Sequence, residues 1–376
     1  MDWEPARGPA RIWWALLGVG AAVAIALVAV MITRPAPGGT LAVRPTARPR
    51  PTASALPRVR AVPTAEVVTA TTGSGPLLPD GADFTLVAGD RRGWWTIDVA
   101  SGALTRWRLT QARSRVLSRA MFMSGDDLIV NLGLGLSAVL RITPDGRTTR
   151  IATQRQAIPT FDDAAVWVHD GIWAETGGFA ALVEPDGSIR EHIRLPSLTR
   201  PAAGTIEGVF VTTETGAKLM SDTGMRPISE AGAIVAAGPT HVAHATCNAR
   251  QVCEIVFGSI AAPDRHRRAL AQGDMPGGFL GPGLGAFSDD GRLLALPVFT
   301  RGATSYVTII DTRTGEEVAR LDGSAEPFTS ALAWSPDSRW LLAASGEGIS
   351  AWSAADGRVI GFDMSFELPI QALAVR

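Results

Sequence analysis

The sequence predicts an all-β fold: a seven-bladed β-propeller preceded by one transmembrane helix and a disordered linker. Three observations lead to this prediction. A strand-and-turn pattern recurs about every forty residues, a long uncharged apolar segment lies near the start of the chain, and a proline-rich stretch separates the two. With 376 residues, 46% of them hydrophobic, the chain is long enough to bury a large core and carry these additional segments.

The recurring unit ends in a turn that contains Asp or Ser and closes on glycine, with a strand on each side. These turns end at Gly102, Gly146, Gly187, Gly224, Gly315 and Gly357. The interval from Gly224 to Gly315 is about twice the others and has room for one more copy near Asp264, which makes seven units. Alternating apolar and polar residues predict four short antiparallel strands in each unit. Such repeats are typical of propeller blades, and the short unit at 203–230 leaves six or eight blades as alternatives.

The two ends of the repeat region complement each other. The first unit, which begins near Asp83, has only three predicted strands, and residues 370–376 form a spare strand after the last unit. In a closed ring this spare strand would be the innermost strand of the first blade. We therefore predict a propeller over residues 81–376, closed by residues 370–376.

Two segments of the later repeats resemble a known class of propeller. "AFSDDGRLLAL" (286–296) and "AWSPDSRWLLAAS" (333–345) look like WD-repeat and TolB-like propeller repeats. "YVTIIDTRTGEEVARL" (306–321) is similar to the strand–Asp–turn–strand ending of such repeats. The resemblance implies a propeller fold and a habit of binding other molecules, and it implies no particular reaction.

The uncharged apolar segment is residues 12–33, "IWWALLGVGAAVAIALVAVMIT". A helix of this length spans about 33 Å at ~1.5 Å per residue, which matches the hydrocarbon core of a bilayer. A cleaved signal peptide is the alternative, but its apolar region is normally only about 7–15 residues long and is followed by a small-residue cleavage site. We predict an uncleaved membrane anchor that follows a short N-terminal tail, residues 1–11.

Residues 34–80 connect the anchor to the repeats. They are rich in Pro, Thr and Ala, carry six Arg, and show no sustained apolar periodicity. Because such a composition cannot bury a core, we predict a disordered spacer that holds the propeller away from the membrane.

Two signals for the orientation of the anchor conflict. Arg7 and Arg11 precede the apolar segment, but more Arg residues follow it, which by the positive-inside rule places the propeller in the cytoplasm. The cysteines favour export, because the only two in the chain, Cys247 and Cys253, are spaced to form a disulfide across a hairpin. We predict a single-pass protein of the cell membrane with an extracytoplasmic C-terminal domain.

Two other states of these cysteines are open: a pair of unpaired buried thiols, or a metal site completed by His241 and His244. Zinc requires four ligands that converge. In a strand, His241 and His244 point to opposite faces, which argues against a metal site. We expect neither a metal nor a cofactor.

Charge and motifs limit the function classes. Residues 1–80 carry a surplus of four positive charges, so the rest of the chain is mildly acidic, which argues against a nucleic-acid partner. The sequence contains no nucleophile elbow, zinc-protease motif, P-loop or EF-hand loop. Lys218 is the only lysine, which is typical of a GC-rich bacterial genome. We therefore expect a bacterial protein that is not an enzyme.

The loops that join the second and third strands of the blades emerge on one face of a propeller, and we call this face the basic rim. Its predicted basic members are Arg91, Arg92, His169, Arg250 and Arg301. Trp94 and Trp173 fall at or near such loops, where an indole can take part in recognition. The alternative is that these are scattered surface arginines and packing tryptophans. The latter role is predicted for Trp95, Trp107, Trp334, Trp340 and Trp352.

These observations predict a membrane-anchored extracytoplasmic propeller that acts as a non-enzymatic protein-binding or scaffolding module of the cell envelope. Its rim would bind an anionic group or an acidic patch of an envelope protein. Two alternatives are a small-ligand sensor and an envelope hydrolase or lyase that uses the propeller channel.

Overall fold

The computed structural model describes the repeat region and the residues just before it. The described residues are 64–376 except 80, 91, 111–114, 134–137, 154–155, 158–171, 177, 185, 198, 206, 230–231, 248–251, 263–266, 275–284, 299–305, 323–330, 346–347, 363, 365 and 367–369. The predicted tail and anchor (1–33) lie outside this set. All regular structure within it is β, and no membrane-spanning helix is found in that part of the chain.

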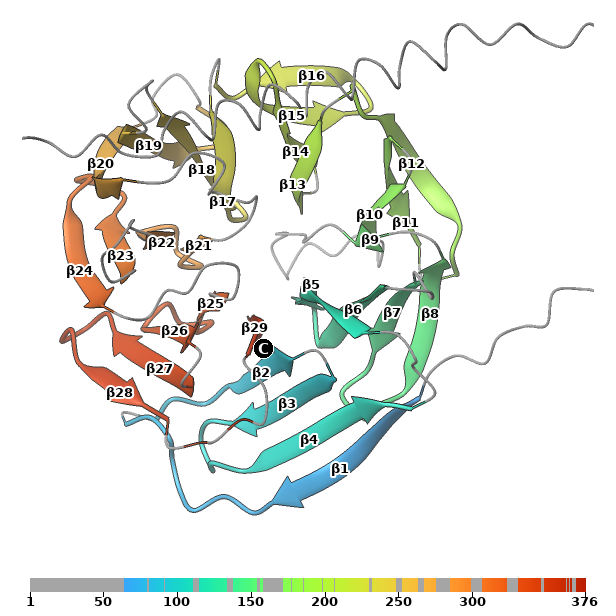
Figure 1. Ribbon diagram of the computed structural model, residues 1–376, viewed down its shortest axis with the longest axis vertical. Helices are drawn as coiled ribbons and strands as arrows, with labels where there is room; N and C mark the ends of the chain where they lie inside the picture. The colour runs from blue at the N-terminus through green and yellow to red at the C-terminus, as the bar shows by residue number, and fades with distance from the viewer. Residues whose placement is uncertain are drawn as a thin grey trace, which may run out of the picture. The chain divides into compact units, whose positions relative to one another are not determined.

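The strands form seven sheets, one of five strands and six of four, which confirms the predicted seven-bladed propeller. The sheets follow one another around a ring (Figure 1). The first strand of each blade lies near its centre, except in blade 1, where the last strand of the chain takes this place. Blade 1 consists of β1 (Ala65–Thr71), β2 (Thr85–Asp90), β3 (Gly93–Asp98), β4 (Leu104–Leu109) and β29 (Ala372–Val375). Blade 2 consists of β5 (Arg115–Ser124), β6 (Asp127–Gly133), β7 (Ala138–Ile142) and β8 (Thr148–Thr153). Blade 3 consists of β9 (Gln156–Ala157), β10 (Ile172–Thr176), β11 (Phe179–Val183) and β12 (Ile189–Arg194).

The other four blades each take four consecutive strands. Blade 4 consists of β13 (Arg200–Thr205), β14 (Gly208–Thr213), β15 (Gly216–Ser221) and β16 (Gly224–Pro227). Blade 5 consists of β17 (Ala233–Ala237), β18 (His241–Cys247), β19 (Val252–Ser259) and β20 (Arg267–Asp274). Blade 6 consists of β21 (Ala286–Phe287), β22 (Leu293–Val298), β23 (Tyr306–Asp311) and β24 (Glu317–Asp322). Blade 7 consists of β25 (Ala331–Trp334), β26 (Trp340–Ser345), β27 (Gly348–Ser353) and β28 (Val359–Gly361).

The ring closes through β29, the last strand of the chain, which pairs antiparallel with β2 as the innermost strand of blade 1. Two backbone hydrogen bonds between Thr85 and Arg376, both 3.0 Å, extend this pairing to the last residue. Buried side chains of β29 pack toward both neighbouring blades, with Leu373 in the seam with blade 7 and Ala372 in the seam with blade 2. This one strand therefore joins blade 1 to both of its neighbours in the ring.

The predicted boundary of the spacer, at residue 80, is too late in the sequence. Residues 65–71, assigned to it from composition, form β1, which pairs with β4 at the outer edge of blade 1 (Figure 1). Six of its seven residues are exposed, so β1 leaves no apolar periodicity in the sequence. Its Val and Thr residues favour a strand, and backbone pairing with β4 satisfies its hydrogen bonds.

The Asp-rich turns of the repeats are local structure. In blade 6 the Ser288 hydroxyl donates to Asp290 (2.6 Å) and accepts from the Leu293 amide (2.9 Å). In blade 7 Ser335 makes the equivalent bonds to Asp337 and Trp340. These carboxylates hold the turn between the first two strands of their blades, as the recurrence of the motif indicates.

Candidate functional site

Three of the seven residues predicted for binding are described: Arg92, Trp94 and Trp173. The other four, Arg91, His169, Arg250 and Arg301, lie outside the described residues. Arg92 is exposed in the turn between β2 and β3, and its amide and that of Gly93 both donate to the carboxylate of Asp90, at 2.6 and 3.0 Å. Its side chain lies on the predicted basic rim, where a partner can reach it.

The prediction that Trp173 belongs to an exposed recognition surface is wrong. Trp173 lies in β10, is 2% exposed, and donates from Nε1 to the Thr205 carbonyl oxygen of the next blade at 3.0 Å. Its neighbours are buried side chains of blades 3 and 4. Trp173 therefore has the packing role that was the alternative. The preceding residues 169–171 made Trp173 look like part of a loop, but β10 begins at Ile172.

Trp94 is also buried, at 3% exposure, but its position is different. It lies in β3 directly opposite Trp107 of β4, and the two rings are stacked with centroids 6.1 Å apart and an angle of 7° between their planes. Two residues further along β3, Thr96 lies opposite Thr105. Because side chains alternate between the faces of a sheet, all four residues lie on the face of blade 1 that meets blade 2.

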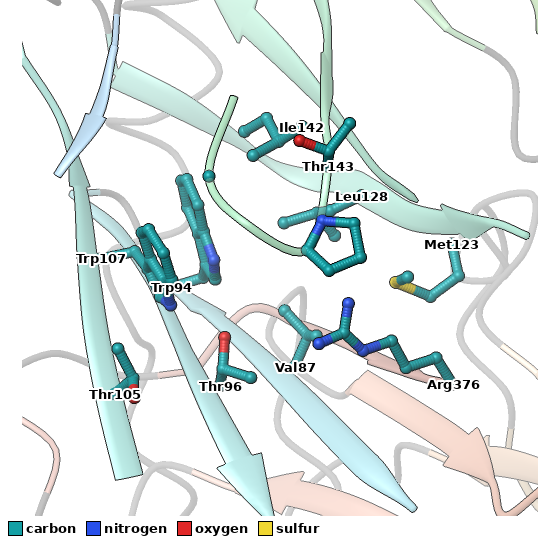
Figure 2. Close-up of a pocket in the computed structure, with 12 residues that line it drawn as sticks. Val87, Trp94, Thr96, Thr105, Trp107, Met123, Leu128, Ile142, Thr143 and Arg376 are labelled. Carbon is teal, nitrogen blue, oxygen red and sulfur yellow. The ribbon is translucent and has the colours of Figure 1, made fainter. Parts of the chain in front are cut away.

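A cavity of about 210 Å³ lies at this seam between blades 1 and 2. Figure 2 shows the two indoles on one side of it, with Met123 and the guanidinium of Arg376 on the other. The residues that line it are Val87, Trp94, Thr96, Thr105, Trp107, Met123, Leu128, Ile142, Thr143, Pro144, Gly146 and Arg376. Val87 and Leu128 are buried while Pro144 is exposed, so the cavity runs from an apolar interior to the surface.

A glycine brings the turn between β7 and β8 against the indole of Trp107. Gly146 has φ +82°, in the left-handed region where glycine is favoured. A Cβ atom at this position would lie only 2.6 Å from Cζ3 of Trp107. Because Gly146 has no side chain, the turn can lie against the Trp107 indole and form one wall of the cavity.

The cavity contains hydrogen-bond donors that have no acceptor among the described residues. The hydroxyls of Thr96 and Thr105 have no hydrogen bond to any described residue, and the buried Nε1 of Trp107 has no acceptor in the same part of the chain. Arg376 donates from Nη1 to the Asp126 carbonyl oxygen at 3.3 Å, which uses one of its five N–H groups. Thr143 differs, because its hydroxyl is bonded to the Asp145 carboxylate and to the Arg147 carbonyl oxygen.

Among the described residues that line the cavity, Arg376 has the only ionisable side chain. The nearest acidic turn carries Asp145, and the Thr143 hydroxyl together with Arg147 lowers the pKa of this exposed carboxyl. Asp145 is therefore ionised and already bonded within its own turn. The described lining contains no His, Cys, Asp or Glu side chain, so this part of the cavity can hold and orient a ligand but supplies no general acid or base.

Sequence reasoning did not identify Thr96, Thr105 or Arg376, and it assigned Trp107 to packing alone. A signal was present in the hairpin "WWTIDVASGALTRW" (94–107), where Trp-x-Thr before the turn is mirrored by Thr-x-Trp after it. Such a mirror places like residues opposite each other on one face of an antiparallel pair. Arg376 leaves no such signal, because its place depends on closure of the ring.

The structure aligns the two cysteines but does not describe their side chains. Cys247 and Cys253 are directly opposite partners in the β18–β19 pair. Opposite residues in an antiparallel pair have Cα atoms about 4.5–5.5 Å apart, which is within the range of a disulfide. The disulfide stays a prediction that this register favours. Within the described residues, no three His, Cys, Asp or Glu side chains are grouped to hold a metal ion.

No protein-family model matches the chain, and no curated protein is similar in sequence. Solved structures are similar in fold. A candidate 6-phosphogluconolactonase from Bacteroides fragilis has a TM-score of 0.52 at 11% identity, covering 80% of this chain and 99% of that one. A protein of unknown function from Desulfotomaculum acetoxidans has a TM-score of 0.50 at 12% identity, covering 78% and 98%. TolB from Acinetobacter baumannii has a TM-score of 0.48 at 14% identity, covering 79% and 68%. At these identities the first two likenesses show a shared fold alone.

Proposed function

We propose that this protein is a non-enzymatic binding module, a membrane-anchored propeller that holds a protein partner outside the cytoplasm. One observation carries the proposal. The described lining of the cavity between blades 1 and 2 has two stacked indoles, threonine hydroxyls and one guanidinium, and it contains no acid–base pair. Such groups recognise a ligand by stacking, hydrogen bonding and charge, and they leave it unchanged.

The size of the cavity favours part of a larger partner. Ligand pockets for whole small molecules are usually about 300–1,000 Å³, and this cavity has about 210 Å³. A side chain that projects from a partner would fill it, while the rest of the partner would contact the surrounding face. Arg92, which is exposed on the basic rim, follows the end of β2, whereas Arg376 is bonded to Thr85 at the start of that strand. Arg92 therefore offers a second place of contact.

The proposed position of the module in the cell rests on features of the sequence. The uncharged segment 12–33 supports a membrane anchor, the Pro-rich residues after it support a spacer, and the opposed cysteines support an oxidising compartment. Extracytoplasmic exposure predicts that protease added to intact spheroplasts degrades the propeller. Protection from the protease until the membrane is broken would place the propeller inside.

The similarity to a candidate 6-phosphogluconolactonase raises hydrolysis as another function. That likeness is at 11% identity, which extends to the fold alone. The described cavity supplies hydroxyls but no base beside them to activate one as a nucleophile. Binding is therefore the function that this site supports.

The proposal can be tested by photocrosslinking in intact cells. A photoreactive amino acid would be placed at Pro144 beside the cavity, at Arg92 on the basic rim, and at Val318 on the outer strand of blade 6, which is 49% exposed and serves as the control. The tag belongs at the N-terminus, because the last strand closes the ring. We expect a discrete protein adduct at Pro144 and none at Val318. Equal labelling at all three positions would contradict a specific partner.

A further inference from the structure

We propose that the cavity between blades 1 and 2 binds a carboxylate attached to an apolar or aromatic body about the size of one side chain. The inference rests on the proposed function in one respect, that this cavity is where the ligand binds. It goes further by naming the chemistry of the group that enters. The same chemistry is found in a free aryl or alkyl carboxylate and in the end of a protein chain.

The apolar body is indicated by the interior of the cavity. Val87, Leu128 and Ile142 are buried there, and Met123 and the two indoles complete the walls. An apolar cavity of about 150 Å³ in a protein core is enough to bind benzene. At about 210 Å³ this cavity has room for a phenyl or branched alkyl group and for a small polar group beside it.

The polar groups of the cavity indicate a carboxylate, because they offer more hydrogen-bond donors than acceptors. The guanidinium of Arg376 lies at the cavity, held by its bond to the Asp126 carbonyl oxygen, and four of its N–H groups have no described acceptor. The hydroxyls of Thr96 and Thr105 and the indole N–H of Trp107 also lack partners in the described part of the chain. A carboxylate accepts several such bonds at once and is bound most strongly by Arg.

The acidic residues near the cavity do not compete for this role. Asp145 lies in the adjacent turn, but its carboxylate is bonded to the Thr143 hydroxyl and to the Arg147 guanidinium, the latter at 2.9 Å. Asp126 contacts Arg376 through its backbone carbonyl oxygen. Arg376 is therefore a cation at the cavity without a carboxylate partner among the described residues.

The test measures binding of defined probes to the full-length protein in mild detergent. The probes are phenylacetate, its neutral amide phenylacetamide, and a short peptide that ends in phenylalanine with either a free carboxylate or an amide. Affinity is measured by calorimetry. The indole N–H signals of ¹⁵N-tryptophan-labelled protein are followed by NMR, with the Trp107 signal identified by its loss in Trp107→Phe.

We expect both carboxylates to bind and both amides to bind at least about tenfold more weakly, since a charge-assisted hydrogen bond is lost. The Trp107 signal should shift on binding. Arg376→Gln should weaken carboxylate binding about tenfold, and Arg376→Lys should restore part of it. The matched control is Arg358→Gln, which removes a charge from an exposed turn of blade 7 and should leave affinity unchanged.

The outcomes separate this inference from the proposed function. Equal affinity for the acids and the amides, or equal losses in Arg376→Gln and Arg358→Gln, would overturn the carboxylate site even if photocrosslinking finds a protein partner. Binding of phenylacetate but not of the peptide would support the site and contradict a protein ligand. Binding of the peptide with a free carboxylate would support both.

Discussion

The two faces of blade 1 are built from the same strands but differ in how they meet the neighbouring blades. Toward blade 7, alternate residues such as Leu86 and Ile97 join a large buried cluster that includes Trp340. Toward blade 2, the residues between them include Thr96 and Thr105, and a cavity remains. One seam is filled and the other is left partly open by two short side chains.

The filled seam also buries a charge pair. Arg106 of β4 is bonded to the Asp90 carboxylate at 2.7 Å, with the two residues 4% and 3% exposed, and its guanidinium lies 5.2 Å from the centroid of the Trp95 ring. A buried pair of this kind depends on both partners, because either one alone would be an uncompensated charge. One seam of the blade is therefore packed, whereas the other contains the cavity that we propose as a binding site.

The largest effect should come from removing residues 370–376, because β29 contributes to both seams. We expect the loss to exceed about 5 kcal/mol, which is enough to unfold a domain of ordinary stability. Circular dichroism and denaturant titration would measure it. The matched deletion is residues 65–71, the exposed outer strand β1, which should cost much less. A truncated chain that still unfolds cooperatively at the original denaturant concentration would contradict the structural role of β29.

The next effect is confined to the filled seam. Arg106→Leu leaves the Asp90 carboxylate buried without its cation, and we expect the free energy of unfolding to fall by about 3–5 kcal/mol. The double variant Asp90→Leu, Arg106→Leu should lose less than the sum of the two single variants, because the two charges are coupled. Denaturant titration measures both. A loss below about 1 kcal/mol in Arg106→Leu would show that this seam tolerates an unpaired charge.

The fold could be predicted from the sequence because its signals are local and repeated. Glycine turns such as the one ending at Gly315 mark six of the units, and the double interval from Gly224 to Gly315 indicates the seventh. The cavity could not be predicted this way. It depends on residues far apart in the chain, Thr96 and Arg376, which ring closure brings together. Trp173 was misplaced for a related reason, since its burial is set by the neighbouring blade rather than by its own segment.

Gly146→Ala tests whether the turn between β7 and β8 forms a wall of the cavity. The left-handed backbone at Gly146 and the 2.6 Å approach of a Cβ atom to Trp107 should together cost about 2 kcal/mol, and they should weaken carboxylate binding. The matched control is Gly357→Ala in blade 7, where φ is +73° but no atom lies within 4 Å. It should cost about 1 kcal/mol, from backbone strain alone, and leave binding unchanged. Equal losses of stability and unchanged binding in both variants would mean that the turn does not define the cavity.

The smallest effect on stability should come from Thr96→Val. Its hydroxyl has no described partner, so removal should change the free energy of unfolding by no more than about 0.5 kcal/mol while weakening carboxylate binding a few-fold. Thr308→Val in blade 6 is the contrasting variant, because that hydroxyl is buried and donates to Glu317 at 2.8 Å. It should cost about 1 kcal/mol or more and leave binding unchanged. If Thr96→Val destabilises the protein as much as Thr308→Val does, the open seam is held together by its hydroxyls, and they are not kept free for a ligand.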